Sequence, residues 1–177
     1  AAFNARALGF PMGEIEAIAL SHSHGDHVGG GRDLVKRIGK PGIELVVHPA
    51  AFKAPRYVKF DGGKSKSQHP PFTREMTAAA GVKVVETREP RPMLGGDVLF
   101  LGEIPRRTPF ETGLPNAYYE EGGVEKKDII ADDTSLVERD ADGVLRFHGD
   151  VSNARDVAAT LDRLERREPF AQSAARD

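Results

Sequence analysis

The chain has 177 residues, a length that suits a single domain with a substantial core. Its formal net charge of −2 argues against a general nucleic-acid binder, because such proteins usually carry a strongly basic face. The sequence contains no cysteine, which excludes disulfides and thiolate metal sites. No apolar run approaches the length of a membrane span and no secretory leader is visible. We therefore predict a cytoplasmic protein that binds neither membrane nor nucleic acid.

The first part of the chain predicts alternating strands and helices. Residues 15–20 (IEAIAL) are typical of a buried strand, and residues 42–48 (GIELVVH) are typical of a second one. Between them, residues 31–39 predict a helix, because apolar residues recur there at helical spacing and a glycine ends the segment. A strand, a helix and a strand in this order predict a parallel pair.

Taken as a whole, the chain predicts a single α/β domain over residues 1–168, followed by a frayed tail at 169–177. Its expected elements are helical turns at 4–9 and 49–54, a helix at 72–80, strands at 82–86 and 97–101 around a proline-rich link at 89–94, a hairpin of strands 134–138 and 144–148, and a last helix at about 153–167.

Three of the six histidines fall within six residues directly after the first predicted strand. His22 and His24, two apart in extended chain, are expected to point the same way. Gly25 is expected to permit a sharp turn that brings Asp26 and His27 round from another side. Neutral imidazole and carboxylate are the usual ligands of zinc, so this spacing predicts a metal site with one or two ions. The alternatives are a surface loop with several histidines, or core histidines satisfied by hydrogen bonds.

Two cation-rich loops are further candidates. The segment 53–66 carries Lys53, Arg56, Lys59, Lys64 and Lys66 against one acid, Asp61. It predicts a solvated surface arm, or alternatively a flap hinged at two glycines whose cations meet an anionic substrate.

The second loop, 102–113, places Arg106 and Arg107 where they could pair with a phosphate group. A solvated turn between strands is the alternative for each of these arginines.

The stretch LSHSHGDHVGG at residues 20–30 resembles the signature of the metallo-β-lactamase superfamily. The resemblance implies an αββα sandwich in which His22 and His24 hold a first metal and Asp26 and His27 hold a second. It implies zinc as the cofactor, with manganese or iron possible, and a water or hydroxide that attacks the substrate. Superfamily members place several strands before this motif, whereas only 21 residues precede His22 here, so we expect a sandwich that is incomplete at the N-terminus.

Other segments resemble one branch of that superfamily, which contains the dihydropterin-(ribofuranosyl)aminobenzene phosphate synthases. They are NA at 4–5, LG at 8–9, HPAAF at 48–52, GEIPRRTPFE at 102–111 and DDTSLV at 132–137. The branch continues with Gly-Cys-x-His, and Ser152 stands here in place of that histidine. Asp150 matches the Gly-Asp of the wider superfamily, which implies a fifth, bridging ligand; its alternative is an acid that leads the next helix. His48 would line the pocket.

The sequence thus predicts a metal-dependent hydrolase-type enzyme in which Asp26 orients a water molecule and takes its proton. A small phosphorylated or carboxylated substrate would contact His48, Arg106 and Arg107. The alternative is a degenerate domain that binds metal without catalysis, which the exchanged histidine and the short N-terminal part favour. No oligomeric state is predicted.

Overall fold

The computed structural model describes residues 2–60, 62–63, 65–67, 72–107 and 109–148. Its first sheet is parallel and has the strand order β1-β2-β5. These strands are β1 (Ala17–Ala19), β2 (Glu44–Val47) and β5 (Lys83–Glu86). The predicted parallel pair is confirmed, because β1 aligns with β2 from Ala17↔Glu44 to Ala19↔Val46.

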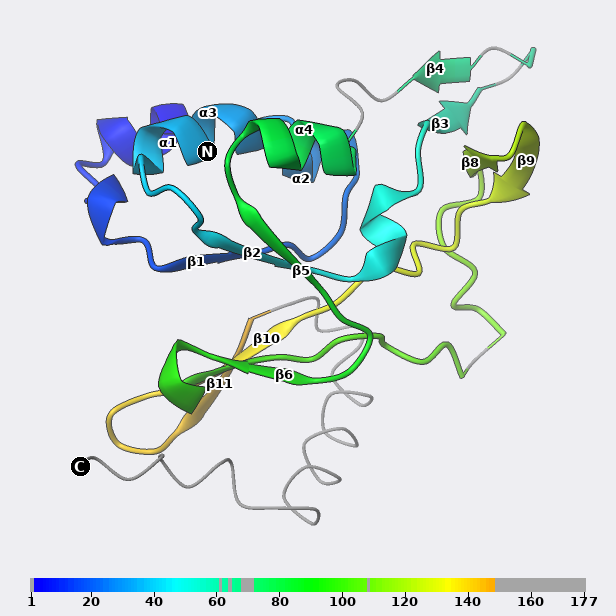
Figure 1. The fold of residues 1–177 in the computed structure, drawn as a ribbon. Coiled ribbons are helices and arrows are strands. Elements are labelled where there is room, and N and C mark those ends of the chain that lie inside the picture. The colour runs from blue at the N-terminus through cyan, green and yellow to red at the C-terminus, as the bar shows by residue number, and fades with distance from the viewer. Residues whose placement is uncertain (1, 61, 64, 68–71, 108, 149–177) are drawn as a thin grey trace.

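Helices lie along one side of this parallel sheet (Figure 1). They are α1 (Ala2–Ala7), α2 (Gly25–Val28), α3 (Gly31–Ile38) and α4 (Arg74–Ala79), with short 3-10 turns η1 (Met12–Glu14) and η2 (Pro49–Phe52). The α4 helix is capped by Thr73, whose hydroxyl accepts a hydrogen bond from Met76 N, and the predicted stop at Gly81 has a φ of 74°. Within the described ranges, no helix has the length and hydropathy that crossing a membrane requires.

A second, antiparallel sheet lies on the other side of the parallel sheet (Figure 1). Its strand order is β11-β10-β7-β6. The strands are β6 (Arg91–Met93), β7 (Val98–Phe100), β10 (Leu136–Arg139) and β11 (Leu145–His148), with the 3-10 turn η3 (Leu94–Gly96) after β6. The predicted hairpin is confirmed by the β10–β11 pairing, whereas the proline-rich link is partly wrong because residues 91–93 form β6 at the sheet edge, where proline is tolerated.

Two apolar layers fill the spaces on either side of the parallel sheet. Between the two sheets, Val46, Met93 and Phe100 are buried together. Between the parallel sheet and the helices, Leu45, Val47 and Phe72 are buried with partly exposed neighbours around them. The β2 strand thus contributes alternate residues to both layers, as a central strand with two covered faces does.

A third sheet, which the sequence analysis did not anticipate, lies at one end of the molecule (Figure 1). Its order is β4-β3-β8-β9, from β3 (Arg56–Lys59), β4 (Ser65–Ser67), β8 (Ala117–Glu121) and β9 (Val124–Lys127). Residues 53–66, predicted as a solvated arm or a hinged flap, contain β3 and the first part of β4, which pair as a hairpin. The β8–β9 turn is Gly122-Gly123, with φ values of 60° and 76°, which is the backbone that a tight hairpin turn requires.

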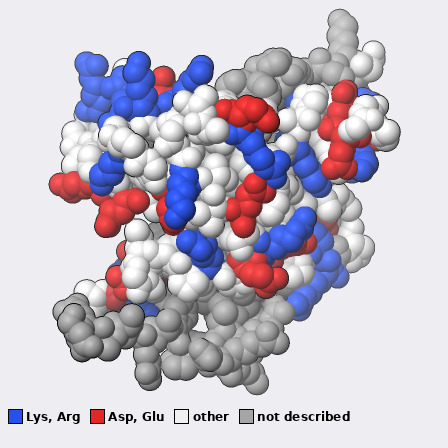
Figure 2. All heavy atoms as spheres, in the orientation of Figure 1, with Lys and Arg blue, Asp and Glu red and all other residues white. Residues whose placement is uncertain are grey.

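Charged side chains of both signs are interspersed over the face shown in Figure 2. Interspersed charges produce a weak long-range field over this face. The predicted last helix at 153–167, the tail from 169, Asp150 and Ser152 lie outside the described residues.

Candidate functional site

The three motif histidines meet directly after β1. The His22 ring centroid lies 4.8 Å from that of His24 and 3.9 Å from that of His27. His24 precedes α2 in an extended conformation, and His27 lies within α2. The chain turns at Gly25 as expected, but without a positive φ: Gly25 begins α2, and the change from extended to helical backbone redirects the chain.

The environment of His22 keeps its imidazole neutral. Burial, together with the neighbouring His27 and His24, lowers the pKa of His22 to about 4. Neutral imidazole is the form that binds a metal ion. This part of the motif therefore has the protonation state that a metal site needs.

Asp26 is placed differently from the histidines. Its side chain is 81% exposed, and its Oδ2 lies 3.7 Å from Nε2 of His27. The other ring nitrogen of His27, Nδ1, is 3.3 Å from the Ser21 hydroxyl. Over the described residues, no group of three or more histidine, aspartate or glutamate side chains has an arrangement that could hold a metal ion. The imidazoles are brought together as predicted, and the carboxylate is turned toward solvent.

His24 is fixed by an acid that the sequence analysis missed. Its Nε2 lies 3.2 Å from Oδ2 of Asp128, and both side chains are buried. Burial alone would raise the pKa of Asp128, but the hydrogen bond from His24 and the charge of Arg56 lower it below its ordinary value. An ionised Asp128 accepts a hydrogen bond from His24 Nε2, and in the neutral form of this ring the lone pair then lies on Nδ1. Asp128 thus orients the His24 ring by contacting Nε2.

Arg56 joins Asp128 to a second buried acid. Its Nη2 donates to Oδ1 of Asp132 at 2.6 Å and to the carbonyl of Ala50 at 2.9 Å. Its Nε is 3.4 Å from Asp128 Oδ2, a charge contact in which Nε makes no hydrogen bond. The prediction that Arg56 belongs to a solvated arm or flap is wrong, because its side chain is 4% exposed and lies between two carboxylates.

The segment 128–134, which we call the clasp segment, makes hydrogen bonds to backbone atoms of the histidine motif. Asp132 Oδ2 accepts a hydrogen bond from Ser23 N at 2.9 Å, and Thr134 N donates to the carbonyl of Ser21 at 3.0 Å. Burial opposes ionisation of Asp132, but Arg56 and the Ser23 N–H lower its pKa below the ordinary value. The sequence signal for this clasp segment was a pair of consecutive acids, at 132 and 133, directly before the strand predicted at 134–138.

The predicted substrate contacts have different surroundings. His48 is 1% exposed, with Nδ1 accepting from Ala50 N at 3.1 Å and Nε2 lying 3.3 Å from Glu103. Arg106 donates to the carbonyl of Ile130 at 2.7 Å, so it is anchored to the segment that clasps the motif. Arg107 is exposed, and its backbone N–H donates to Glu111. A substrate contact at these residues stays a prediction.

A sequence model of the metallo-beta-lactamase superfamily matches residues 1–167. The chain belongs to the metallo-β-lactamase superfamily. The predicted α/β fold of this family is confirmed by a solved structure, that of Tm1679, described as a metal-dependent hydrolase of the β-lactamase superfamily. It has a TM-score of 0.60 and 20% identity, and the match covers 92% of this chain and 56% of that one. The likeness shows the fold alone.

Other superfamily structures match less well. A HARLDQ-motif mutant of the Cronobacter sakazakii metallo-β-lactamase has 20% identity and a TM-score of 0.43, covering 93% of this chain and 55% of that one. The metallo-β-lactamase SMB-1 bound to 2-mercaptoethanesulfonate has 16% identity and a TM-score of 0.41, covering 97% and 60%. The chain thus spans somewhat more than half the length of each structure. No curated protein matches it.

Two glycines beside the superfamily motif offer a matched pair of substitutions. A Cβ at Gly29 would lie 2.6 Å from the carbonyl oxygen of Gly25, whereas a Cβ at Gly31 would meet nothing within 4 Å. We expect Gly29→Ala to lower the free energy of unfolding by about 1–3 kcal/mol, because the backbone must shift to relieve the clash with the Gly25 carbonyl. Gly31→Ala should change it by less than about 1 kcal/mol, in the stabilising direction. Urea denaturation of both variants checks this, and equal effects would contradict it.

His48 predicts a pH dependence of stability. Burial and the charge of Arg88 lower the pKa of His48. The hydrogen bond to Glu103 opposes this shift but does not reverse it. Below about pH 6.5 the unfolded chain then binds more protons at this position, so the free energy of unfolding falls as the pH falls. Urea denaturation at about pH 7.5 and 5.5 should show that the free energy of unfolding falls less between these pH values in His48→Gln than in the original chain. An equal fall in both proteins would show that His48 does not contribute to the pH dependence of stability.

Proposed function

We propose that this chain is a metal-dependent, hydrolase-type enzyme whose metal ligands are His22, His24, Asp26, His27 and Asp150. The observation that carries the proposal is the contact among the three imidazoles, with His24 oriented by the buried Asp128. Zinc is the preferred ion, in one or two copies, and manganese or iron are alternatives. Three neighbouring imidazoles with a carboxylate nearby supply the donor types that such an ion binds.

A bound divalent cation would lower the pKa of a coordinated water toward about 7 and stabilise negative charge that develops on the substrate. The chain's own groups supply the remaining functions. Asp26, exposed on α2 beside His27, would orient that water and accept its proton. Asp128, whose carboxylate also contacts Arg56, would hold the His24 ring in one orientation.

The substrate would be a small phosphorylated or carboxylated molecule. Arg106 supports this proposal, because it is fixed beside the clasp segment and its buried Nε has no hydrogen-bond partner among the described residues. Arg107 would add a second cation from the exposed loop. His48 would contribute from the pocket wall if substrate binding uncovers its ring.

We further propose that the chain is related to the branch of dihydropterin-(ribofuranosyl)aminobenzene phosphate synthases. The supporting observation is that Asp132 and Thr134, in the DDTSLV segment that carries the resemblance, contact the motif loop directly. A phosphate-bearing substrate is consistent with the arginines of the adjacent loop.

A degenerate metal-binding domain without catalysis is the second candidate. It is favoured by the exposed placement of Asp26 and by the lack of a closed metal cluster among the described side chains. The two candidates differ in turnover rather than in metal content.

Elemental analysis and a turnover assay on the same zinc-loaded sample separate these candidates. We expect one or two zinc ions per chain and zinc-dependent hydrolysis of a model phosphodiester or thioester. A chelator should remove the hydrolysis, and added zinc should restore it. Bound zinc without turnover on either substrate class would support the degenerate domain. A chain that binds none of zinc, manganese and iron would overturn both candidates.

A further inference from the structure

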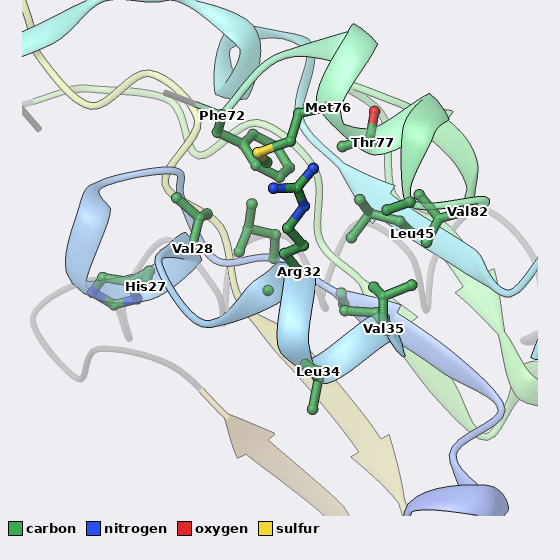
Figure 3. A pocket seen from close by; sticks show the side chains of 15 residues that line it. His27, Val28, Arg32, Leu34, Val35, Leu45, Phe72, Met76, Thr77 and Val82 are labelled. Atoms are coloured by element: carbon green, nitrogen blue, oxygen red, sulfur yellow. The ribbon is translucent and has the colours of Figure 1, made fainter. Parts of the chain in front are cut away.

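An apolar cavity of about 160 Å³ lies beneath α3 and α4, over the helix-covered face of the parallel sheet (Figure 3). Its lining is mostly apolar and includes Val35, Leu45, Phe72, Met76, Ala80 and Val82. The proposed catalytic function does not use this space. A cavity of about 150 Å³ with an apolar lining is known to stay dry and to take up benzene or xenon, so this one has room for a compact apolar group.

The cavity follows from small residues at positions where helices face the sheet. Gly31 on α3 and Thr77 and Ala80 at α4 line it, and none of them reaches far from its backbone. The Thr77 hydroxyl is occupied by a hydrogen bond to the carbonyl of Arg74 at 2.8 Å, so it offers no free donor to the cavity. An apolar occupant therefore leaves no polar group of Thr77 unsatisfied.

Among the described residues that line the cavity, Arg32 is the one lysine or arginine. Arg32 extends from α3 toward Phe72 and Met76, where its guanidinium lies over the apolar wall (Figure 3). The residue is exposed, and its side chain makes no hydrogen bond or ion pair within the described part of the chain. A guanidinium fork in this position matches a carboxylate, which it can bind through two parallel hydrogen bonds.

We propose that this cavity binds a small amphipathic carboxylate, with its aryl or short alkyl group between the helices and the sheet and its carboxylate on Arg32. His27 borders the cavity, but its ring lies away from Phe72 and Met76 (Figure 3). The proposed carboxylate contact is on Arg32 and not on His27, and the test reads binding without depending on hydrolase activity.

The test uses benzoate, benzene and acetate as probes of the full chain, followed by NMR of the methyl groups of Val35, Met76 and Val82. We expect shifts with benzoate at millimolar concentration, weaker shifts with benzene, and none with acetate. Ala80→Leu, which fills the cavity, should abolish both sets of shifts. Arg32→Gln should weaken benzoate binding at least fivefold and leave benzene binding unchanged. Arg37→Gln, on the same helix but outside the lining, is the matched control.

Several outcomes would overturn the proposal. These are absence of benzoate binding, benzoate shifts that persist when the cavity is filled, or equal losses in the Arg32 and Arg37 variants. Thermal unfolding verifies that Ala80→Leu is folded. If it is not, Val82→Phe fills the same cavity from the sheet side and carries the same expectation.

Discussion

Replacing Arg56 with methionine is expected to lower the free energy of unfolding by about 3–5 kcal/mol. The substitution keeps most of the side-chain volume, but it leaves two carboxylates, Asp128 and Asp132, buried without the cation that faces both. A buried charge that loses its partner costs far more than the pair contributes when intact. Urea denaturation measures the effect, and the loss should be accompanied by a loosened motif, since Asp132 holds Ser23 and Asp128 holds His24.

Arg74 supplies the matched control for this prediction. It forms a bidentate ion pair with Glu86 at 2.6 and 2.7 Å, and its side chain is more than half exposed. Arg74→Met should therefore cost at most about 1 kcal/mol. Adding Asp132→Asn to Arg56→Met should restore part of the lost stability, because one uncompensated charge disappears. Equal losses of stability in Arg56→Met and Arg74→Met would show that the buried network contributes no more to stability than an exposed ion pair.

The second prediction concerns the metal ligands. We expect Asp26→Ala to lower turnover by about 10²–10⁴-fold, because the proposed base contributes on that scale. His22→Ala should remove bound zinc and turnover together, since it takes away the imidazole that contacts both other rings. Zinc content by elemental analysis and hydrolysis of the model substrate are measured on the same samples.

Asp33→Ala is the control for Asp26→Ala. Both acids are exposed and lie in the first turn of neighbouring short helices. A general effect of removing a helix-leading carboxylate would change both variants alike. Full activity in the Asp26 or His22 variant would reject the proposed roles of these residues.

The sequence predicted those parts of the molecule that depend on short stretches of chain. The period of the apolar residues indicated the parallel pair around α3, and the Asp-Gly turn indicated the β10–β11 hairpin. The histidine spacing predicted that three imidazoles and the Asp26 carboxylate would share a metal site; the imidazoles do lie together, whereas Asp26 is exposed to solvent. The Gly122-Gly123 turn was an equally local signal for the β8–β9 hairpin, and it was overlooked.

Long-range electrostatics was the part that local patterns did not reveal. Arg56 sits in a run of cations, and such runs are usually solvated. Its partner Asp132 lies 76 positions away along the chain, so neither residue gives a sign of the other. The acid that orients His24 is 104 positions from it. Burial of these charges follows from the way the third sheet and the clasp segment meet the motif, which only the folded chain shows.

X-ray absorption at the zinc edge of the zinc-loaded chain tests most directly whether the motif side chains share a cation. We predict a first shell that contains at least two imidazole nitrogens at about 2.0–2.1 Å. One imidazole should disappear from that shell in His24→Ala, while the spectrum of Asp33→Ala should match that of the original chain. A shell of oxygen ligands alone, unchanged by substitution of the motif histidines, would contradict the proposed site.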